Sequence, residues 1–217
     1  MSPDEDDPRE PVWQAIAHRS LDIFFAVVLL LLTAPLFVVL IVWIRVDSSG
    51  PALFRQERLG RHRRPFTFYK FRSMVVDGDD AAHRALIAAE IRGETTVVGG
   101  STKLSDDPRV TRAGRFLRST SLDELPQLFN VLRGDMSLIG PRPCLAWEAD
   151  MFPEEYAERF TVRPGLTGLW QVRGRSSLGT LDMLRLDLEY VRTRRLRLDL
   201  FILLATVPSL LRGNGAR

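Results

Sequence analysis

The chain has 217 residues, enough for one domain with a sizeable core, or for a membrane element plus one compact cytosolic domain. Its net charge is +3, but the first ten residues carry five acidic side chains against Arg9. The other residues hold 29 basic and 22 acidic side chains, a net charge of +7, which suits anionic partners such as phosphates, anionic lipids or nucleic acid. The basic residues are 28 Arg against only Lys70 and Lys103, a bias that a GC-rich genome also produces.

Cysteine and histidine usage limits the redox and metal chemistry. Cys144 is the single cysteine, which excludes an intramolecular disulfide and fits a reducing compartment. His18, His62 and His83 are scattered without paired spacing, which argues against zinc. A metal would therefore be a hard cation held by carboxylates.

The N-terminal part predicts a membrane element. Residues 1–11 indicate a disordered acidic leader that lacks the basic start of a signal peptide. Residues 23–44 are 22 uncharged residues, long enough to enter a bilayer as a helix, and Pro35 interrupts their backbone hydrogen bonding. Because arginines flank both ends of this run, the positive-inside tendency favours a re-entrant helix-break-helix at Pro35, with a kinked span as the alternative. We expect residues 12–46 to form this hairpin and residues 47–217 to form one cytosolic and interfacial domain.

The remaining elements follow in chain order. The segments LFRQERLG and PFTFYKFRSM predict two strands of a hairpin around residues 60–65. Helical patterns cover 77–92, 111–118, 122–133 and 178–195, with a loop at 93–108, and Gly134 should end the third helix. The apolar run 200–211 is too short to span and suits an interfacial position. The fold class is therefore α+β and mainly helical, with interfacial amphipathic helices.

The densest polar cluster is RFLRSTSLDELPQLFNVLRGDMSLIGPRP, residues 115–143. Asp123 and Glu124 suit a helix start, either as a capping box of Ser121 with Glu124 or with Asp123 as the cap. The alternative is functional, because Arg115 and Arg118 precede the pair and a proline-stiffened turn carries Arg142. Carboxylates among arginines indicate phosphoryl chemistry, in which a carboxylate attacks phosphorus while a divalent cation and arginines neutralise the phosphate oxygens.

A second cluster, RPGLTGLWQVRGR at residues 163–175, combines glycines that permit close backbone approach with Arg163, Arg173 and Arg175. The pattern is similar to a phosphate or nucleotide loop, although it lacks the Gly-Lys-Ser/Thr of a P-loop. The four aromatic residues of 66–71 favour core or membrane-interface positions over base stacking.

Over residues 16–211 these segments, in this order, resemble the bacterial sugar transferase family, the monotopic polyprenyl-phosphate phosphoglycosyl transferases. The resemblance rests on the proline-broken apolar N-terminus, FRQERLG, FYKFRSM, LRSTSLDELPQLFNVLRGDMSLIGPRP, RPGLTGLWQVRGR, and Asp187 with Tyr190. It implies that Asp123 attacks a UDP-sugar, that UMP leaves, and that undecaprenyl phosphate, a polyprenyl phosphate, then accepts the phosphosugar to begin a surface glycan. It also implies that Glu124, together with Asp123, binds magnesium (Mg2+), and that Arg118, Arg142 and Arg175 hold phosphates, with Arg163 a weaker candidate.

The same resemblance implies a bacterial inner-membrane protein whose active site faces the cytoplasm, in the minimal catalytic form without a four-helix extension. The chain departs from the family at Ala34, where serine is usual and Thr33 could substitute, and at Arg173, where asparagine is usual. Two other hypotheses are a membrane anchor whose basic face binds lipid or nucleic acid, and an enzyme that makes a soluble sugar product. The absence of a nucleic-acid-binding motif argues against nucleic acid as a partner, and the soluble enzyme leaves the apolar termini unexplained.

Overall fold

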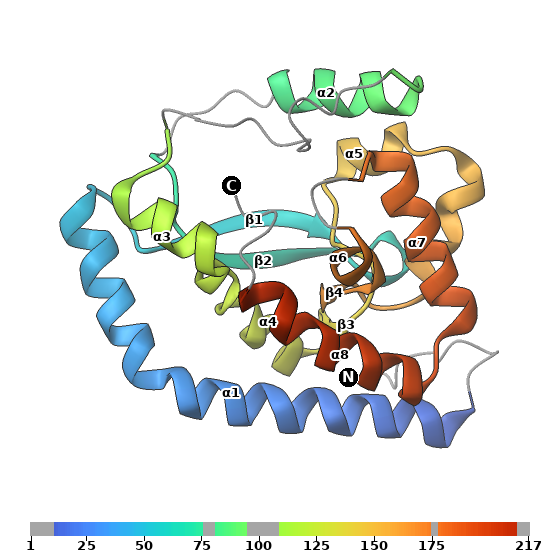
Figure 1. Cartoon of the computed structure of the whole chain (residues 1–217), viewed down its shortest axis with the longest axis horizontal. Helices are drawn as coiled ribbons and strands as arrows, with labels where there is room; N and C mark the ends of the chain where they lie inside the picture. Colours follow the sequence, from blue (N-terminus) through green and yellow to red (C-terminus); the bar gives the residue numbers. More distant parts are fainter. Residues whose placement is uncertain (1–10, 76–80, 95–108, 175–177, 212–217) are drawn as a thin grey trace.

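The computed structural model describes residues 11–75, 81–94, 109–174 and 178–211. Within these ranges the chain is mainly helical with two small sheets, as the sequence predicts (Figure 1). The helices are α1 (Val12–Asp47), α2 (Ala81–Ile91), α3 (Arg112–Thr120), α4 (Gln127–Arg133), α5 (Ala146–Met151), α6 (Leu169–Arg173), α7 (Thr180–Thr193) and α8 (Leu196–Leu211). The strands are β1 (Leu53–Leu59), β2 (Pro65–Phe71), β3 (Ser137–Ile139) and β4 (Gly165–Thr167), and 3-10 turns are η1 (Arg61–Arg63), η2 (Leu122–Glu124) and η3 (Glu154–Thr161).

Helix α1 is continuous over 36 residues, with Pro35 inside it. The prediction that the helix is interrupted at Pro35 is therefore wrong. The helix bends instead, and its two arms lie at a clear angle in Figure 1. Proline removes one backbone donor and displaces one carbonyl, which kinks a helix whose apolar neighbours still favour helical geometry. The hydroxyl of Thr33 donates to the carbonyl of Leu29 at 2.6 Å, a contact that itself favours bending. Re-entry into the membrane stays a prediction.

The middle of α1 presents apolar side chains outward. The helix is long and apolar enough to cross a membrane, and only 11% of its most apolar 18-residue window is buried within the structure. Leu31 and Leu32 are 71% and 72% exposed. A soluble protein would bury such a surface, so the helix fits membrane association.

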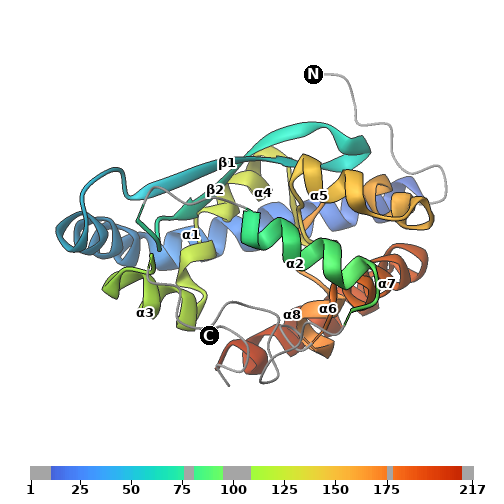
Figure 2. The same cartoon turned by 90° about the horizontal axis from the view of Figure 1, so that it is seen from above.

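The two arms of α1 each join a hydrophobic core. Ala26 packs in a cluster with residues of α4, β3 and α8, including Leu128 and Ile202. Leu40 and Ile44 pack in a second cluster with residues of α3 and the end of β2, including Phe71. Both views place α4 alongside α1 (Figures 1 and 2). The membrane helix is therefore part of the folded body along both arms.

The predicted hairpin is confirmed. Strands β1 and β2 pair antiparallel from Leu53 opposite Phe71 to Leu59 opposite Pro65. Because side chains alternate along a strand, one face carries Gln56 and Arg58 of β1 with Phe68 and Lys70 of β2. Phe68 and Phe71 are buried, which confirms the prediction of core positions for these aromatics.

The predicted helix over residues 122–133 is divided. Ser121 adopts a left-handed conformation with φ of 58°, η2 follows, and α4 begins only after Pro126. Neither Ser121 nor Asp123 caps a helix, because η2 and α4 both lack a side-chain cap hydrogen bond. The capping interpretation is therefore wrong. Gly134 ends α4 with φ of 89°, as expected.

The other predicted helices differ from the observed ones only in their first and last residues. Helices α2, α3, α7 and α8 correspond to the predicted helices and to the C-terminal apolar run. The leader at 1–10 and most of the predicted loop at 93–108 lie outside the described residues.

Close backbone contacts fix the turn that carries Arg142. Strands β3 and β4 pair in parallel, and the amide of Gly140 donates to Thr167 at 2.9 Å while the amide of Gly165 donates to Pro141 at 2.8 Å. A Cβ atom on Gly165 would lie 2.1 Å from the Gly140 nitrogen, so no larger residue fits. The glycines of the second cluster thus allow close approach to the chain's own backbone.

Candidate active site

The acidic pair lies where η2 meets the end of the hairpin. Asp123 is buried, with 3% of its surface exposed, and its Oδ2 lies 2.5 Å from the Nζ of Lys70. The lysine side chain is 30% exposed. Lys70, the ion-pair partner of the Asp123 carboxylate, therefore has part of its side chain in contact with solvent.

Strand geometry explains why Lys70 reaches Asp123. Lys70 occupies the same face of the hairpin as Phe68, whose buried ring fixes the strand against the core. The hairpin also contacts α4 through Asn130, whose side chain accepts from the Tyr69 amide at 3.1 Å and donates to the Thr67 carbonyl at 2.7 Å. The edge of β2 is thus hydrogen-bonded to α4, and Lys70, on the face of β2 that carries Phe68, pairs with Asp123 in the turn that precedes α4.

Arg58 connects Glu124 with the turn that carries Arg142. Its Nη1 donates to the carbonyl of Pro143 at 2.6 Å, and its guanidinium lies 4.5 Å from the centre of the Phe68 ring. Burial and, to a smaller extent, the charge of Arg142 lower the pKa of Arg58 to about 10, although the charges of Glu148, Cys144 and Glu124 oppose the shift. The guanidinium is therefore still charged at neutral pH, and Glu124 and Arg142 both lie within its electrostatic reach.

A buried ion pair fixes the backbone at Arg142. Arg159 Nη2 donates to Asp187 Oδ2 at 2.8 Å and to the Arg142 carbonyl at 2.7 Å, and both side chains of the pair are 3% exposed. Asp187 also accepts a hydrogen bond from the backbone of Arg142. Burial raises the pKa of Asp187 to about 6, although Arg159 opposes this increase. The side chain of Arg142 itself remains exposed, 5.8 Å from the centre of the Trp170 ring.

The other predicted phosphate ligands lie in separate parts of the structure. Arg118 is half-buried in the last turn of α3, five residues before Asp123. Arg163 instead lies beyond the opposite end of α4, where its Nε donates to the Gly134 carbonyl at 2.9 Å. Arg175 lies outside the described residues, and the neighbouring Arg173 pairs with Glu189 at 2.7 Å on the surface.

The sequence analysis missed two residues of this site. Lys70 and Arg58 come from the hairpin, which was interpreted only as a structural element. A signal was present, because Lys70 is one of two lysines in a chain with 28 arginines, and it lies among aromatic residues in a strand. Alternation along the paired strands would also have placed Lys70 and Arg58 on one face.

The acidic pair fits one mode of magnesium binding. Among the described residues, no three His, Cys, Asp or Glu side chains are grouped so that they could hold a metal ion. Magnesium is commonly held by one or two carboxylates together with substrate phosphates, rather than by a cage of protein ligands. Asp123 and Glu124 supply such a donor set, because their carboxylates lie on adjacent residues beside cationic groups.

Comparison with known proteins identifies the family of this chain. The family model described as bacterial sugar transferase matches residues 13–213, so the chain belongs to the bacterial sugar transferase family. Among its relatives, a UDP-glucose:undecaprenyl-phosphate glucose-1-phosphate transferase of Caulobacter vibrioides is 45% identical, with 93% of this chain and 72% of that protein covered. The exopolysaccharide production protein ExoY of Rhizobium meliloti is 35% identical, with 99% and 93% covered.

Other relatives are longer. The galactosyl transferase CpsE of Streptococcus agalactiae is 42% identical over 93% of this chain but only 44% of its own length. The chain therefore spans less than half of that relative.

Proposed function

We propose that this protein transfers a sugar 1-phosphate from a UDP-sugar to undecaprenyl phosphate, as the first membrane step of surface polysaccharide synthesis. The observation that carries the proposal is the buried carboxylate of Asp123 paired with the amino group of Lys70, with Glu124 as the next residue. A carboxylate held among cations can approach an anionic phosphate that would otherwise repel it. The names of the Caulobacter relative and of an undecaprenyl-phosphate galactose phosphotransferase of Salmonella typhimurium, 42% identical, support the same reaction.

The reaction proceeds in two displacements. An oxygen of Asp123 attacks the sugar-bearing phosphorus, and the bond from that phosphorus to the UMP oxygen breaks with its electron pair on UMP. A phosphate oxygen of undecaprenyl phosphate then attacks the same phosphorus, and the bond to Asp123 breaks to restore the carboxylate. The acceptor and the leaving group are phosphates, so neither step needs a proton donor.

The cations have separate roles in this scheme. Lys70 neutralises Asp123 before the attack and binds a phosphate oxygen after the carboxylate has become an acyl phosphate. Arg142, on a turn fixed by Arg159, holds the diphosphate in line. Magnesium held by Asp123 and Glu124 supplies charge neutralisation at the phosphate oxygens when it is bound.

The decisive experiment compares Asp123→Asn with Asp182→Asn, which changes an exposed carboxylate of α7 that forms an ion pair with Arg185. With magnesium, undecaprenyl phosphate and a UDP-sugar, Asp123→Asn should reduce UMP release by at least about a thousandfold. The control should retain nearly full activity. Mass spectrometry of the wild type without acceptor should detect a phosphosugar on Asp123, and near-full activity of Asp123→Asn would contradict the proposal.

The fold also supports a monotopic arrangement with the active site on the cytoplasmic face. Both arms of α1 pack on the same folded body: Arg19 donates to the carbonyls of Val131 and Leu132, and Arg72 donates to the carbonyl of Ile44. A straight span would separate these contacts by the bilayer, whereas a bent helix that enters and leaves on one side preserves them.

Cysteine labelling tests this arrangement. In a Cys144→Ser background, Val12→Cys and Val46→Cys place thiols at exposed positions near the two ends of α1. We expect both to be protected from a membrane-impermeant maleimide in intact cells and labelled after permeabilisation. Labelling of one end in intact cells would show a spanning helix.

A further inference from the structure

A cluster of two arginines and a tyrosine lies at the C-terminal end of α4, whereas Asp123 precedes the other end of this helix. The guanidinium carbon of Arg133, in the last turn of α4, lies 5.1 Å from the centre of the Tyr69 ring, and that of Arg55 lies 5.9 Å from it. Arg133 Nη1 also donates to the Tyr69 hydroxyl at 2.8 Å. Both arginines are exposed and the tyrosine is half-buried, so the cluster is open to solvent.

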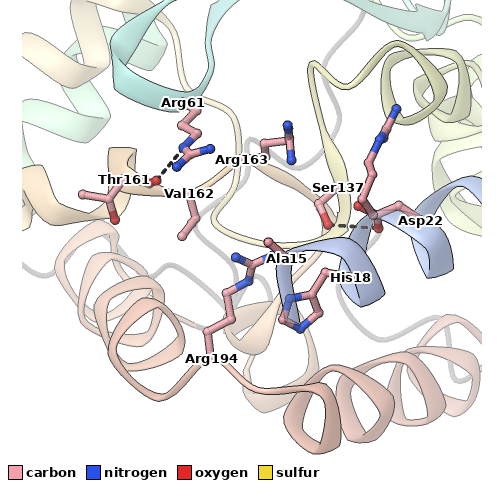
Figure 3. Close-up of a pocket in the computed structure, with 10 residues that line it drawn as sticks. Ala15, His18, Asp22, Arg61, Ser137, Thr161, Val162, Arg163 and Arg194 are labelled. Carbon is pink, nitrogen blue, oxygen red and sulfur yellow. Dashed lines mark hydrogen bonds between the residues drawn. The ribbon is translucent and has the colours of Figure 1, made fainter. Parts of the chain in front are cut away.

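Strand register places two members of this cluster. Arg55 of β1 lies directly opposite Tyr69 of β2, and directly opposed side chains of an antiparallel pair lie on one face. The hairpin is fixed at its turn, where Arg61 Nε donates to the Thr161 carbonyl at 2.9 Å (Figure 3). Lys70 follows Tyr69 in β2 and therefore lies on the other face. The cluster and the proposed active site thus use opposite faces of the hairpin.

The two arginines of the cluster have no carboxylate partner in the part of the chain that the structure describes. The contacts of Arg55 and of Arg133 are with Tyr69. Glu57 lies on the same face of β1 as Arg55, but among the described residues it forms no ion pair. The two guanidinium carbons are no farther apart than their ring distances together, which is close to the screening length of about 10 Å at 0.1 M salt. An anion bound between them would relieve their mutual repulsion.

The cluster borders an exposed apolar surface. Phe129 precedes Arg133 by one turn of α4, so both side chains lie on one face of the helix, and Phe129 is 44% exposed. The Phe129 ring lies 6.0 Å from that of Phe37, which follows the bend of α1 by two residues. Val38 and Val39, the next residues of α1, are exposed. The cationic groups are therefore continuous with the apolar surface of the helix that fits membrane association.

We propose that this cluster binds the phosphate of an anionic phospholipid of the surrounding bilayer, with the acyl chains over Phe129 and the exposed side of α1. Guanidinium groups form charge-assisted hydrogen bonds with phosphate oxygens. The Tyr69 hydroxyl accepts from Arg133 and donates its own proton to the same phosphate. The apolar border favours a lipid over a soluble phosphate.

The site does not depend on the transfer reaction. A phosphate held on this face of the hairpin is separated from Lys70, on the other face, and from its partner Asp123. The bound lipid would connect the end of α4 with the hairpin and hold this side of the body at the membrane surface.

Native mass spectrometry of the detergent-solubilised full chain tests the proposal, with phosphatidylglycerol or phosphatidylcholine added. The wild type should retain phosphatidylglycerol in preference to phosphatidylcholine. Arg55→Gln/Arg133→Gln should weaken this retention by roughly thirtyfold, the factor that two basic side chains contribute near an anionic lipid surface. The control Arg63→Gln/Arg64→Gln removes two exposed arginines at the turn of the same hairpin and should retain lipid like the wild type.

Further variants keep both arginines of the cluster. Phe129→Glu places a carboxylate one helical turn before Arg133, where it competes with the phosphate, so the phosphatidylglycerol preference should be lost. Phe129→Leu keeps the apolar surface and should keep the preference. Tyr69→Phe keeps the ring and removes the hydroxyl donor, so retention should decrease by about tenfold. Circular dichroism should show unchanged helix content in each variant.

Competition identifies the source of the phosphate. Equimolar undecaprenyl phosphate and millimolar inorganic phosphate should each leave bound phosphatidylglycerol in place, and Asp123→Asn should retain it like the wild type. Equal retention by the wild type and Arg55→Gln/Arg133→Gln would overturn the assignment, as would a loss of the same size in Arg63→Gln/Arg64→Gln. Displacement by either competitor would also overturn it, because the cluster would then be a site for the acceptor or for a soluble anion.

Discussion

Two acid–base pairs of similar chemistry differ in their surroundings. Lys70 and Asp123 lie 2.5 Å apart with the lysine 30% exposed, whereas Arg159 and Asp187 lie 2.8 Å apart and are both 3% exposed. The first pair can exchange partners when a phosphate arrives from solvent. The second is closed to solvent and bound to the backbone of Arg142. Exposure, rather than the identity of the charges, therefore separates the pair proposed to react from the pair that is bound to the backbone of Arg142.

The largest expected effect is on stability. Asp187→Ala leaves Arg159 charged and buried without its carboxylate, which should lower the free energy of unfolding by about 3–5 kcal/mol. Thermal unfolding in detergent measures the loss. An Arg159→Met/Asp187→Leu variant should recover most of it, because neither charge remains buried. An unfolding temperature unchanged by Asp187→Ala would show that the pair does not stabilise the fold.

Lys70→Ala should affect rate far more than stability. The variant removes a cation that neutralises Asp123 and the phosphate, so UMP release should decrease by about a hundredfold. Because Lys70 is partly exposed, the free energy of unfolding should change by about 1 kcal/mol or less. Lys70→Arg, which keeps the charge, should recover part of the rate. A loss of stability as large as that of Asp187→Ala would remove the distinction between the two pairs.

The buried pair should also produce a pH dependence. The pKa of Asp187 is about 6 in the folded protein against an ordinary value of 3.8, so the folded chain binds the extra proton between these values. The contribution of Asp187 to stability therefore decreases as pH rises across that window. The ionised carboxylate is the form that holds Arg159, and kcat/KM should rise with pH through about 6. This rise of kcat/KM with pH should be absent in Asp187→Asn. If the rise persists in that variant, a different group causes it.

The smallest expected effect concerns Arg163. The side chain binds Gly134 at the far end of α4 from Asp123, so Arg163→Ala should remove about 1 kcal/mol of stability through the lost hydrogen bond. We expect UMP release to stay within about threefold of the wild type. A hundredfold loss would return Arg163 to the phosphate-binding group that the sequence pattern suggested.

The hairpin, the helices at both ends and the stop at Gly134 follow from local patterns, so the sequence predicts them well. The turn before α4 does not, because Ser121 adopts a left-handed conformation that neighbouring residues do not require. The residue types there suit a helix cap, either a capping box of Ser121 with Glu124 or Asp123 as the cap, and this was one of the two interpretations of the acidic pair. Tertiary contact overrode this preference, since Asp123 binds Lys70 from a strand 53 residues earlier in the sequence.

In the candidate site, too, residues within one local pattern were predicted, whereas residues from distant segments were not. The sequence pattern singled out Asp123, Glu124 and Arg142, and the charges of Glu124 and Arg142 both act on Arg58 of the hairpin. Lys70 and Arg58 were missed, because their contribution depends on strand register and on packing across distant segments. Glycines such as Gly165 were correctly predicted to permit close approach, but the approaching group is the backbone at Gly140.

The contacts of α1 bear on how this protein can be handled. Arg19 supplies donors to the end of α4, Asp22 accepts from β3, and Asp47 accepts from the amide of Ala113 at the start of α3. A version that lacks α1, designed to be soluble, would lose these partners and open both hydrophobic clusters. We therefore expect the protein to need detergent or lipid for folding, and solubility has to be sought by shielding the exposed apolar side chains in the middle of α1.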